Sequence, residues 1–551
     1  MSQVTITRDV RVPMRDNVEL SADIYKPKQT PAPGIVLRTP YGKLSKAQHD
    51  NGVFFAENGY VVMYMDVRGR GDSDGEFSPY RNDGIDGYDS IEWLAAQDYC
   101  NGIVGTMGGS YLGHVQFLTA LHQPPSLKAM IPIVSPSDPF VEWPTGVPSP
   151  HHMCWLFMVG GRQMQNVDVV DWEQVYKTLP IEKMDEATGR YSKHWKEEMQ
   201  HNTFDDYWDH VAYQEKFDRI DIPALHISGW YDDEQIGTPL NFTRMFNPTT
   251  DKKHAKDNYL LMGPWPHGIN QSTSLGELEF GPDSLIDLKG YQLKFFDKYL
   301  KGIDNDFGED KKNVDIFLMG HNKWVKEENW PLPDAVPTKY YISSERGANS
   351  RFGDGKLTTD PSEVDFGSDS YNYDPLDPVP YVTDVVSSQI GGADDYSAIE
   401  RRDDVLVYST DELTEDTAVV GPLRAKLYVT SDCKDTDFMV KLLDVHPNGK
   451  AIRMMDGMTR MRYREGMEKE VLMTPGEVYE IEVDVWNTSN VFKAGHKIRI
   501  EISSSAFPKY DRNLNTGESL ATSEAVKVAH NTVFFDKDQL SYIELPIKNL
   551  K

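Results

Sequence analysis

The stretch GTMGGSYLGH, from Gly105 to His114, decides the fold of this 551-residue chain. Its serine, Ser110, follows an apolar run typical of a buried strand and precedes YLGHVQFLTALH, a pattern typical of a helix. The small residues around Ser110 leave room for strand and helix to approach, as a sharply bent nucleophile elbow requires. The usual G-x-S-x-G spacing is not met, because Leu112 stands two residues after the serine and Gly113 three. The motif by itself fits either a nucleophile or a glycine-rich turn.

Short apolar runs alternate with helical patterns on both sides of this motif. The runs that predict buried strands include APGIVLRTPYG, GYVVMYMDVRGRG, LKAMIPIVSP, IPALHISGWYDD and NYLLMGPWPHG. Such alternation is typical of a parallel α/β sheet. We therefore assign residues 1–138 and 219–311 to an α/β unit. Residues 139–218 are more polar, rich in aromatic side chains and helical in pattern, and they are predicted to form a cap inserted into that unit.

The last part of the chain has a different sequence pattern. After the acidic linker GIDNDFGEDKKN, many short alternating segments follow at even spacing, beginning with VDIFLMG and ending with LSYIELPIK. Turn residues separate them, and this pattern favours an all-β sandwich of jelly-roll type. We assign residues 312–551 to it.

Composition narrows the classes of function. The formal net charge is −29, from 57 basic and 86 acidic residues, which disfavours a nucleic-acid partner. The three cysteines form no CxxC pair, the start does not resemble a signal peptide, and no apolar run reaches the length of a membrane span. We expect a cytoplasmic protein that acts on a small molecule away from membranes, and we leave a homo-oligomer open.

A nucleophilic serine needs a base and an acid that orients it. His267 in LLMGPWPHG and Asp232 in LHISGWYDDE each follow a predicted strand, where doubly wound sheets carry their sites. The chain order serine, acid, histidine is the order of α/β-hydrolase triads. Taken singly, His267 fits a surface loop and Asp232 a helix cap. In this order and at these strand ends, the three residues predict a hydrolytic triad.

These motifs resemble the CocE/NonD hydrolases, whose branches include cocaine esterase, the α-amino acid ester hydrolases and, more distantly, X-Pro dipeptidyl peptidases. The resemblance spans nearly the whole chain and rests on RTPYGK, DVRGRGDSDGEF, GTMGGSYLGH, GWYDDEQIG, GPWPHG and GHKIRIEISSSAFPKYDRNLNTGE. It implies an α/β-hydrolase fold with a helical cap and a C-terminal jelly roll. It also implies that Ser110 is the nucleophile, His267 the base and Asp232 its orienting acid. An oxyanion hole would be formed by the Tyr41 hydroxyl and the Tyr111 backbone N–H.

The resemblance also bears on the acyl group. It places Glu234 in the acyl pocket, where the α-amino ester hydrolases have a glutamate and the cocaine esterase branch an aromatic residue. Gln235 stands where a second carboxylate of the amine-binding set would be. Trp143 stands loosely where the third would be, with Glu142 as a substitute for it. Glu234 thus fits either an ammonium partner or a hydrated rim residue, and Trp143 fits an apolar wall.

We expect a serine hydrolase of carboxylic esters, with amides left open, that works through an acyl-enzyme and needs no cofactor. An α-amino ester hydrolase or acyltransferase acting on β-lactam-type acyl groups is the alternative. A dipeptidyl peptidase is less well supported, because no N-terminal extension is evident. An alternative of another class is an inactive binding protein with the sandwich as its ligand module. DVRGRGDSDG fits a structural loop rather than a dinucleotide motif, and the histidines show no metal-ligand spacing.

Overall fold

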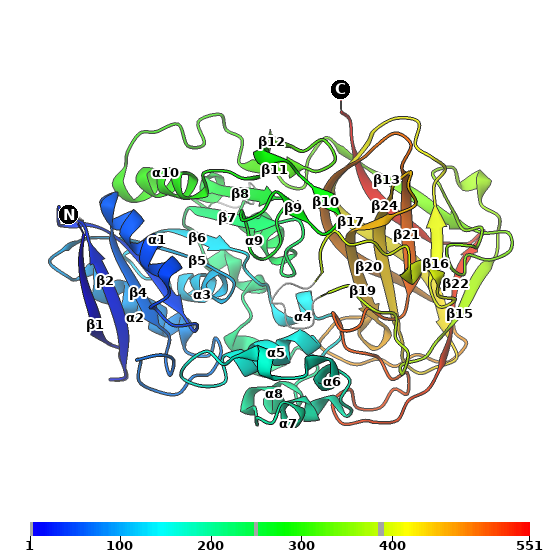
Figure 1. Ribbon diagram of the computed structural model, residues 1–551, viewed down its shortest axis with the longest axis horizontal. Helices are drawn as coiled ribbons and strands as arrows, with labels where there is room; N and C mark the ends of the chain where they lie inside the picture. The colour runs from blue at the N-terminus through cyan, green and yellow to red at the C-terminus, as the bar shows by residue number, and fades with distance from the viewer. Residues whose placement is uncertain (1–3, 247–251, 384–390, 551) are drawn as a thin grey trace.

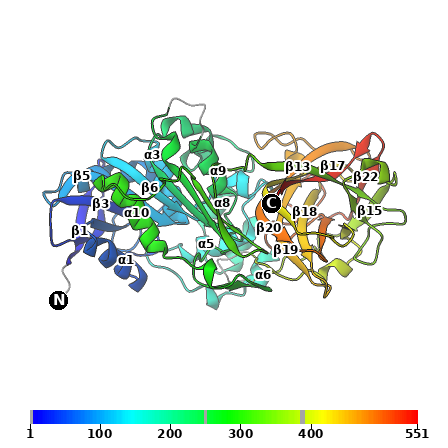
Figure 2. The same cartoon turned by 90° about the horizontal axis from the view of Figure 1, so that it is seen from above.

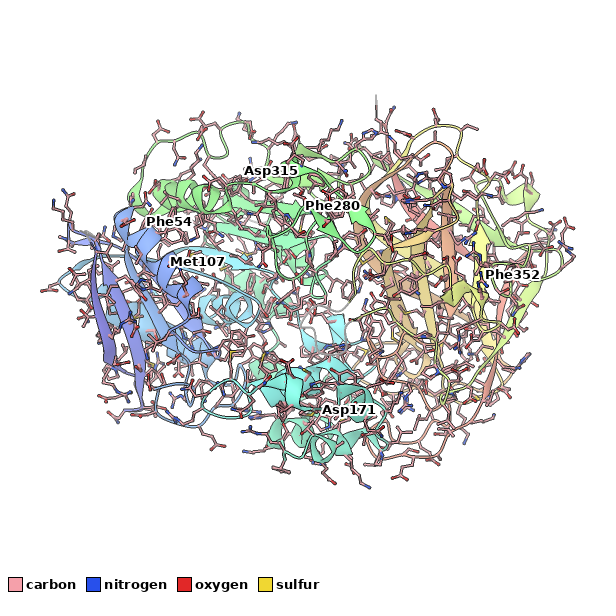
Figure 3. The ribbon with its side chains drawn as sticks, in the orientation of Figure 1. Phe54, Met107, Asp171, Phe280, Asp315 and Phe352 are labelled. Carbon is pink, nitrogen blue, oxygen red and sulfur yellow. The ribbon has the colours of Figure 1, made fainter. Side chains whose placement is uncertain are left out.

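Three regions are visible in the computed structural model, which describes residues 4–246, 252–383 and 391–550 (Figure 1). Helices surround a sheet at the left, in blue to green, and strands dominate the yellow-to-red right side. A small group of teal helices lies below and between them. Met107, three residues before Ser110, lies within the left region, and Asp171 lies in the teal group (Figure 3).

A ten-stranded sheet forms the frame of the first region. Its strands are β1 (Thr5–Pro13), β2 (Glu19–Lys26), β3 (Ala32–Thr39), β4 (Val61–Asp66), β5 (Cys100–Gly109), β6 (Leu127–Ile133), β7 (Ala224–Gly229), β8 (Asn258–Gly263), β11 (Val314–Leu318) and β12 (Lys323–Glu327). They lie in the order β1-β2-β4-β3-β5-β6-β7-β8-β11-β12, parallel from β4 to β11 and antiparallel at both edges. The strand order reverses between β3 and β5, and such a reversal opens a crevice at the carboxyl ends of the strands. Tyr41 follows β3 and Ser110 follows β5, so both stand at this crevice.

Helices cover both faces of the sheet (Figure 2). The helices are α1 (Lys46–Glu57), α2 (Asp83–Ala95), α3 (Tyr111–Ala120), α9 (Gly237–Met245) and α10 (Leu288–Lys301). In β4, Val61 and Met63 pack into the cluster that holds α2 and α3, whereas Val62 and Tyr64 pack into the one that holds α1 and α10. Since successive side chains of a strand point to opposite faces, a strand covered on both sides must be apolar throughout. This is why the central strands appear in the sequence as unbroken apolar runs.

The cap lies between β6 and β7, as the sequence predicts. Its helices are short: α4 (Pro139–Glu142), α5 (Pro150–Met158), α6 (Trp172–Tyr176), α7 (Met184–Ala187) and α8 (Lys193–Glu198). Trp172 and Trp195 form its small core, together with Tyr463 and Leu520 from the C-terminal region. The cap is therefore held from both sides.

The C-terminal region is rich in strands, which form one twelve-stranded sheet with mostly antiparallel pairing. The strands are β13 (Ala335–Ser343), β14 (Lys356–Thr358), β15 (Ser368–Tyr373), β16 (Leu406–Ser409), β17 (Thr417–Ser431), β18 (Asp437–Val445), β19 (Ala451–Arg460), β20 (Tyr479–Phe492), β21 (Lys497–Ser503), β22 (Ala529–Asp536), β23 (Gln539–Leu540) and β24 (Tyr542–Lys548). A separate two-stranded piece, β9 (Ser274–Leu275) with β10 (Leu278–Glu279), follows β8 in the chain. The jelly-roll connectivity and the three domain ranges stay predictions, except for the start of the third range, where the structure places β11 and β12 in the first sheet.

The strand at VDIFLMG corrects the sequence analysis, which assigned it to the sandwich. Val314 pairs in parallel with Leu260 of β8, and β12 then pairs antiparallel with β11. The strand therefore extends the first sheet. A parallel neighbour needs a crossover connection, and α10 supplies it by carrying the chain back to that edge. The segment alternates and follows a linker, so its pattern alone could not reveal which sheet it joins.

One hydrophobic core runs through both large regions. Trp230, directly after β7, packs on Trp330 with ring centroids 5.4 Å apart. The same cluster continues through β11 into the interior strands of the C-terminal region, such as Val440 and Ile500.

Candidate active site

Ser110 stands in a strained backbone conformation at the turn from β5 to α3. Its φ of 60° and ψ of −125° lie outside the regions that a residue with a side chain ordinarily adopts. Its N–H donates to the Ile133 carbonyl over 2.9 Å, and its own carbonyl accepts from the N–H groups of Gly113 and His114. These three bonds hold the turn in place, as a nucleophile elbow requires.

Two glycines make the turn sterically possible. A Cβ on Gly113 would lie 2.8 Å from the Ile133 carbonyl oxygen, which is closer than packed atoms allow. A Cβ on Gly108, whose φ is 146°, would lie 2.5 Å from the Cβ of Leu112. Gly113 thus performs, one position later, the packing role of the second glycine in the usual motif.

His267 and Asp232 meet at the ends of β8 and β7. His267 Nδ1 lies 2.8 Å from Asp232 Oδ1, and the Asp232 side chain is fully buried. Ser228 donates to the other carboxylate oxygen over 2.6 Å, and the Glu234 N–H donates to Oδ1 over 3.2 Å. The carboxylate is therefore fixed by donors on both oxygens and fixes the imidazole in turn.

Two further carboxylates lie close to the same imidazole. Asp233 Oδ1 is 3.4 Å and Glu234 Oε2 is 4.0 Å from His267 Nδ1. Burial acts to lower the pKa of His267, but Asp232, Asp233 and Glu234 outweigh it and raise this pKa well above its usual range. Burial raises the pKa of Asp233 to about 7 and that of Glu234 well above its usual range, although His267 opposes both shifts. The imidazolium that forms during proton transfer is strongly stabilised here.

Asp232, Asp233 and His267 also lie as close together as the ligands of a metal ion would. His267 Nδ1 and Asp232 Oδ1, however, are hydrogen-bonded over 2.8 Å, and both Asp232 oxygens accept further bonds, from Ser228 and from the Glu234 N–H. The cluster is therefore arranged to hold and move a proton.

Tyr41 presents its hydroxyl at the crevice, and the cap orients it. Trp155 of α5 donates its indole N–H to the Tyr41 oxygen over 3.1 Å. Burial raises the pKa of Tyr41 to about 12, although hydrogen bonds with Trp155 and Ser110 oppose the rise. Tyr41 is therefore a neutral phenol at physiological pH. Because the indole is donor only, the phenolic proton remains to be donated elsewhere.

The DVRGRGDSDG loop holds the Tyr41 segment, in line with the structural role predicted for it. Arg70, which is fully buried, donates to the Pro40 carbonyl and to the Val159 carbonyl of the cap, each over 2.7 Å. Asp66 accepts the Lys43 N–H over 2.8 Å. The chain is thus anchored at Pro40, directly before Tyr41, and at Lys43, two residues after it.

Tyr111 is the first residue of α3, so its backbone N–H has no acceptor within the helix. Its side chain is buried and donates to Asp83, and its ring stacks on Tyr80 with centroids 4.4 Å apart. The side chain therefore serves packing, and only the backbone of Tyr111 is placed for chemistry.

A cavity of about 460 Å³ unites these groups. Its lining includes Ser110, His267, Tyr41, Glu234 and Trp143, and further lining residues come from the first region, from the cap and from the C-terminal region. The cavity walls therefore come from all three regions of the chain.

Gln235 does not belong to this lining, which departs from the sequence prediction of a substrate contact. Its amide donates to the Asn487 carbonyl over 2.6 Å and to the Trp230 carbonyl over 3.3 Å. The Asn487 side chain donates back to Gln235 over 3.3 Å. Gln235 is fully buried and connects the first region to β20.

The structure places Glu142, the substitute carboxylate of the sequence analysis, in the lining, and it adds site residues that the sequence analysis missed. Glu142 reaches the cavity from α4, and burial together with Glu234 raises its pKa well above the usual range. Lys509 and Trp486 come from the C-terminal region, with the Lys509 ammonium 4.6 Å from the Trp486 ring centre. Trp155 and Ser228 carry no motif, because their roles depend on contacts between segments distant in sequence.

Comparisons with known proteins agree with this geometry. The family described as X-Pro dipeptidyl-peptidase (S15 family) matches residues 16–269, and the X-Pro dipeptidyl-peptidase C-terminal non-catalytic domain matches residues 305–544. Cocaine esterase from Rhodococcus sp. (strain MB1 Bresler) is 35% identical over 98% of both chains.

Solved structures show the same fold at lower identity. An α-amino acid ester hydrolase superposes with a TM-score of 0.86 at 24% identity, covering 99% of this chain and 97% of the other. A CocE/NonD family hydrolase from Staphylococcus aureus superposes with a TM-score of 0.72 at 21% identity, covering 99% and 94%.

The α/β-hydrolase fold and the matched proteins define a serine hydrolase that cleaves esters. More narrowly, the chain belongs to the CocE/NonD family. The prediction of an enzyme is thereby confirmed, and the alternative of an inactive binding protein is not supported. Among the described residues, no helix has the length and apolar character needed to cross a membrane.

Proposed function

We propose that this hydrolase cleaves esters through an acyl-enzyme on Ser110, with His267 as base and Asp232 as its orienting acid. The observation that carries the assignment is the 2.8 Å contact between His267 Nδ1 and Asp232 Oδ1 beside the strained turn of Ser110. Ser110 and His267, from distant segments, line one cavity, and the buried Asp232 supports His267 from behind.

The chemistry follows from these positions. Ser110 Oγ attacks the ester carbonyl while its proton passes to His267 Nε2, because Nδ1 is held by Asp232. The tetrahedral intermediate collapses, the bond to the leaving oxygen breaks, and His267 returns the proton to the departing alcohol. Water then attacks the acyl-enzyme by the same route and frees the acid.

The developing oxyanion needs two donors. Tyr41 supplies a phenolic proton that the Trp155 contact leaves available, and Tyr111 supplies its backbone N–H at the start of α3. Such donors stabilise charge that exists only in the intermediate, so they act on the rate more than on substrate binding.

The acidic lining favours a second, narrower candidate: esters whose acyl group carries an α-amino group. Glu142, Asp233 and Glu234 line the cavity, and burial raises the pKa of all three carboxyls. Within the described residues, Asp233 Oδ1 and Glu234 Oε2 are buried without a hydrogen bond to any group. A substrate ammonium would neutralise and hydrogen-bond them. Trp143 and Trp155 would then face the apolar part of the acyl group.

The test compares kcat/KM for the methyl esters of phenylglycine and phenylacetic acid. We expect wild type to favour the amino ester by about tenfold or more, which equals about 1.4 kcal/mol. Glu234→Gln should lose this preference and keep its rate on the phenylacetic ester. Glu215→Gln, which changes an exposed carboxylate paired with Arg244, is the control.

Equal rates for the two esters would refute the amine candidate and leave the ester hydrolase intact. The triad assignment is tested separately with Ser110→Ala, which should lose activity on both esters. Activity unchanged in that variant would refute the assignment of the nucleophile.

The remaining parts of the proposal concern the setting. We keep the cytoplasm as the location and small molecules, rather than nucleic acid, as partners, which the net charge of −29 and the three free cysteines support. A homo-oligomer stays open.

A further inference from the structure

Two histidines and an aspartate gather at one end of the β18–β21 pair. Asp444 and His446 are two residues apart, so their side chains point to the same face. Val445 pairs with Lys497, which brings His446, just past β18, opposite His496, just before β21. Because His446 and His496 are far apart in sequence, their spacing gives no metal motif, and the sequence analysis assigned none.

The ligand atoms of these residues converge. His496 Nδ1 lies 2.8 Å from Asp444 Oδ1, and His446 Nε2 lies 3.7 Å from Asp444 Oδ2. One ligand atom from each residue lies within 4.8 Å of the other two, and the two ring centroids are 4.5 Å apart. A tetrahedral Zn²⁺ with ligands at about 2.0–2.1 Å separates its ligand atoms by roughly 3.3 Å. The two observed separations involve the two different oxygens of Asp444, so binding one ion requires side-chain rotations that break the His496–Asp444 hydrogen bond.

The backbone under each histidine is fixed. The His446 N–H donates to Lys450 across a tight turn, and its carbonyl accepts from Gly449, each over 2.9 Å. The His496 N–H donates to Lys493 over 3.0 Å, and its carbonyl accepts from Leu413 over 2.8 Å. Ligands on rigid turns lose little freedom on binding an ion, which is the arrangement that a metal site needs.

The surroundings of these three residues suit a cation that keeps one coordination position open to solvent. The Asp444 side chain is buried, whereas His446 and His496 keep 26% and 15% of their side-chain surface exposed. Asp395 adds negative charge nearby, although its oxygens already accept bonds from Ser397 and Ala451. Lys450, the neighbouring cation, pairs with Glu277.

We propose that Asp444, His446 and His496 form a binding site for a divalent transition-metal ion, with Zn²⁺ as the expected ion and water completing its shell. Two imidazoles and one carboxylate are a common protein ligand set for this ion. The ion would join the β18–β19 turn to β21 and so stabilise this edge of the C-terminal region.

The site is separate from the hydrolytic centre. It lies at the start of β21, whereas Lys509 and Tyr510, which line the cavity, follow the other end of that strand. A strand of this length spans roughly 20 Å. Ion binding should therefore change stability and leave ester hydrolysis unchanged.

The test is a titration of the full-length, EDTA-treated and desalted protein with ZnCl₂ in a non-chelating buffer, followed by calorimetry and by melting temperature. We expect one equivalent to bind at this site and to raise Tm. His446→Gln and His496→Gln should each weaken binding by about 100-fold or more, since even indirect partners of a metal contribute 10–100-fold. The matched control is His321→Gln, which changes a histidine 3.1 Å from the carboxylate of Asp416.

Each outcome decides the proposal. Binding that survives both histidine substitutions, or that disappears only in His267→Ala, would assign the ion elsewhere and overturn it. Absence of binding to wild type would leave only the His496–Asp444 hydrogen bond beside His446 and would also overturn it. If a glutamine variant has a lower Tm than wild type in the absence of metal, two other measurements take its place. These are zinc binding by Asp444→Asn and the absorption spectrum of wild type loaded with Co²⁺. A spectrum without nitrogen ligation would refute the site.

Discussion

Trp155 of the cap and Tyr41 after β3 are joined by a hydrogen bond of 3.1 Å from indole nitrogen to phenolic oxygen. The contact ties the orientation of a proposed oxyanion donor to the position of a helix that covers the cavity. Displacement of α5 would therefore turn the Tyr41 hydroxyl as well as open the acyl pocket.

This coupling predicts a non-additive pair of variants. Tyr41→Phe should lower kcat by ~10²–10³, the usual effect of losing one oxyanion donor. Trp155→Phe should lower kcat by about fivefold, because a hydrogen bond of roughly 1 kcal/mol no longer positions that donor. In the double variant the Trp155 change should add almost nothing to kcat. Full multiplication of the two effects on kcat would show that Trp155 acts only through acyl binding.

Ser228 is predicted to matter through Asp232. Ser228→Ala removes the donor that lies 2.6 Å from Asp232 Oδ2 and leaves that oxygen buried. Since a hydrogen bond to a charged group contributes about 1.5–3 kcal/mol, kcat/KM should fall by about tenfold or more. The exposed Ser272→Ala serves as the control. Wild-type kcat/KM in Ser228→Ala would argue that Asp232 needs no support from this side.

The carboxylates around His267 predict a direction for the pH profile. Only neutral His267 can accept the proton of Ser110, and Asp233 favours its charged form from 3.4 Å. Asp233→Asn removes that charge, so the pKa of His267 falls and the acidic limb of kcat/KM moves to lower pH. The measurement uses phenylacetic methyl ester, whose charge does not change, with exposed Asp209→Asn as the control. An acidic limb that moves to higher pH would contradict the assignment of His267 as base.

Gln235 is predicted to support stability rather than substrate binding. Gln235→Leu leaves the Asn487 carbonyl buried without its 2.6 Å donor, a loss of about 1–3 kcal/mol in the free energy of unfolding. Denaturant unfolding should register this loss, while KM stays within about twofold of wild type. A raised KM with unchanged stability would restore Gln235 to the acyl pocket.

Local sequence patterns were sufficient to predict the central strands and the turn that carries Ser110. The central strands are buried on both faces, so their apolar runs mark them individually, and the Gly-rich turn marks the elbow even with Gly113 displaced by one position. Val314–Leu318 shows the limit of prediction from local patterns. Which sheet this short strand joins depends on a crossover helix and on its partner strand, β8.

The residues of the site also fall into two groups, those that local sequence could indicate and those that it could not. Ser110, Asp232 and His267 could be proposed because each follows a strand and because they resemble a family in their order. Ser228 and Lys509 could not, since their importance arises from contacts across segments that the chain brings together only on folding. Gln235 was placed at the substrate by the resemblance alone, and the sequence could not reveal its buried contact with Asn487.

The hydrophobic core that passes from Trp230 through Trp330 into the C-terminal strands has a thermodynamic consequence. Two bodies that share one interior cannot expose their apolar surfaces independently, so the melting of either removes the support of the other. The chain should then lose its structure in a single calorimetric transition, with a van't Hoff enthalpy close to the calorimetric one. A catalytic fragment expressed without the strand-rich half would expose to solvent the apolar surface that the two halves share.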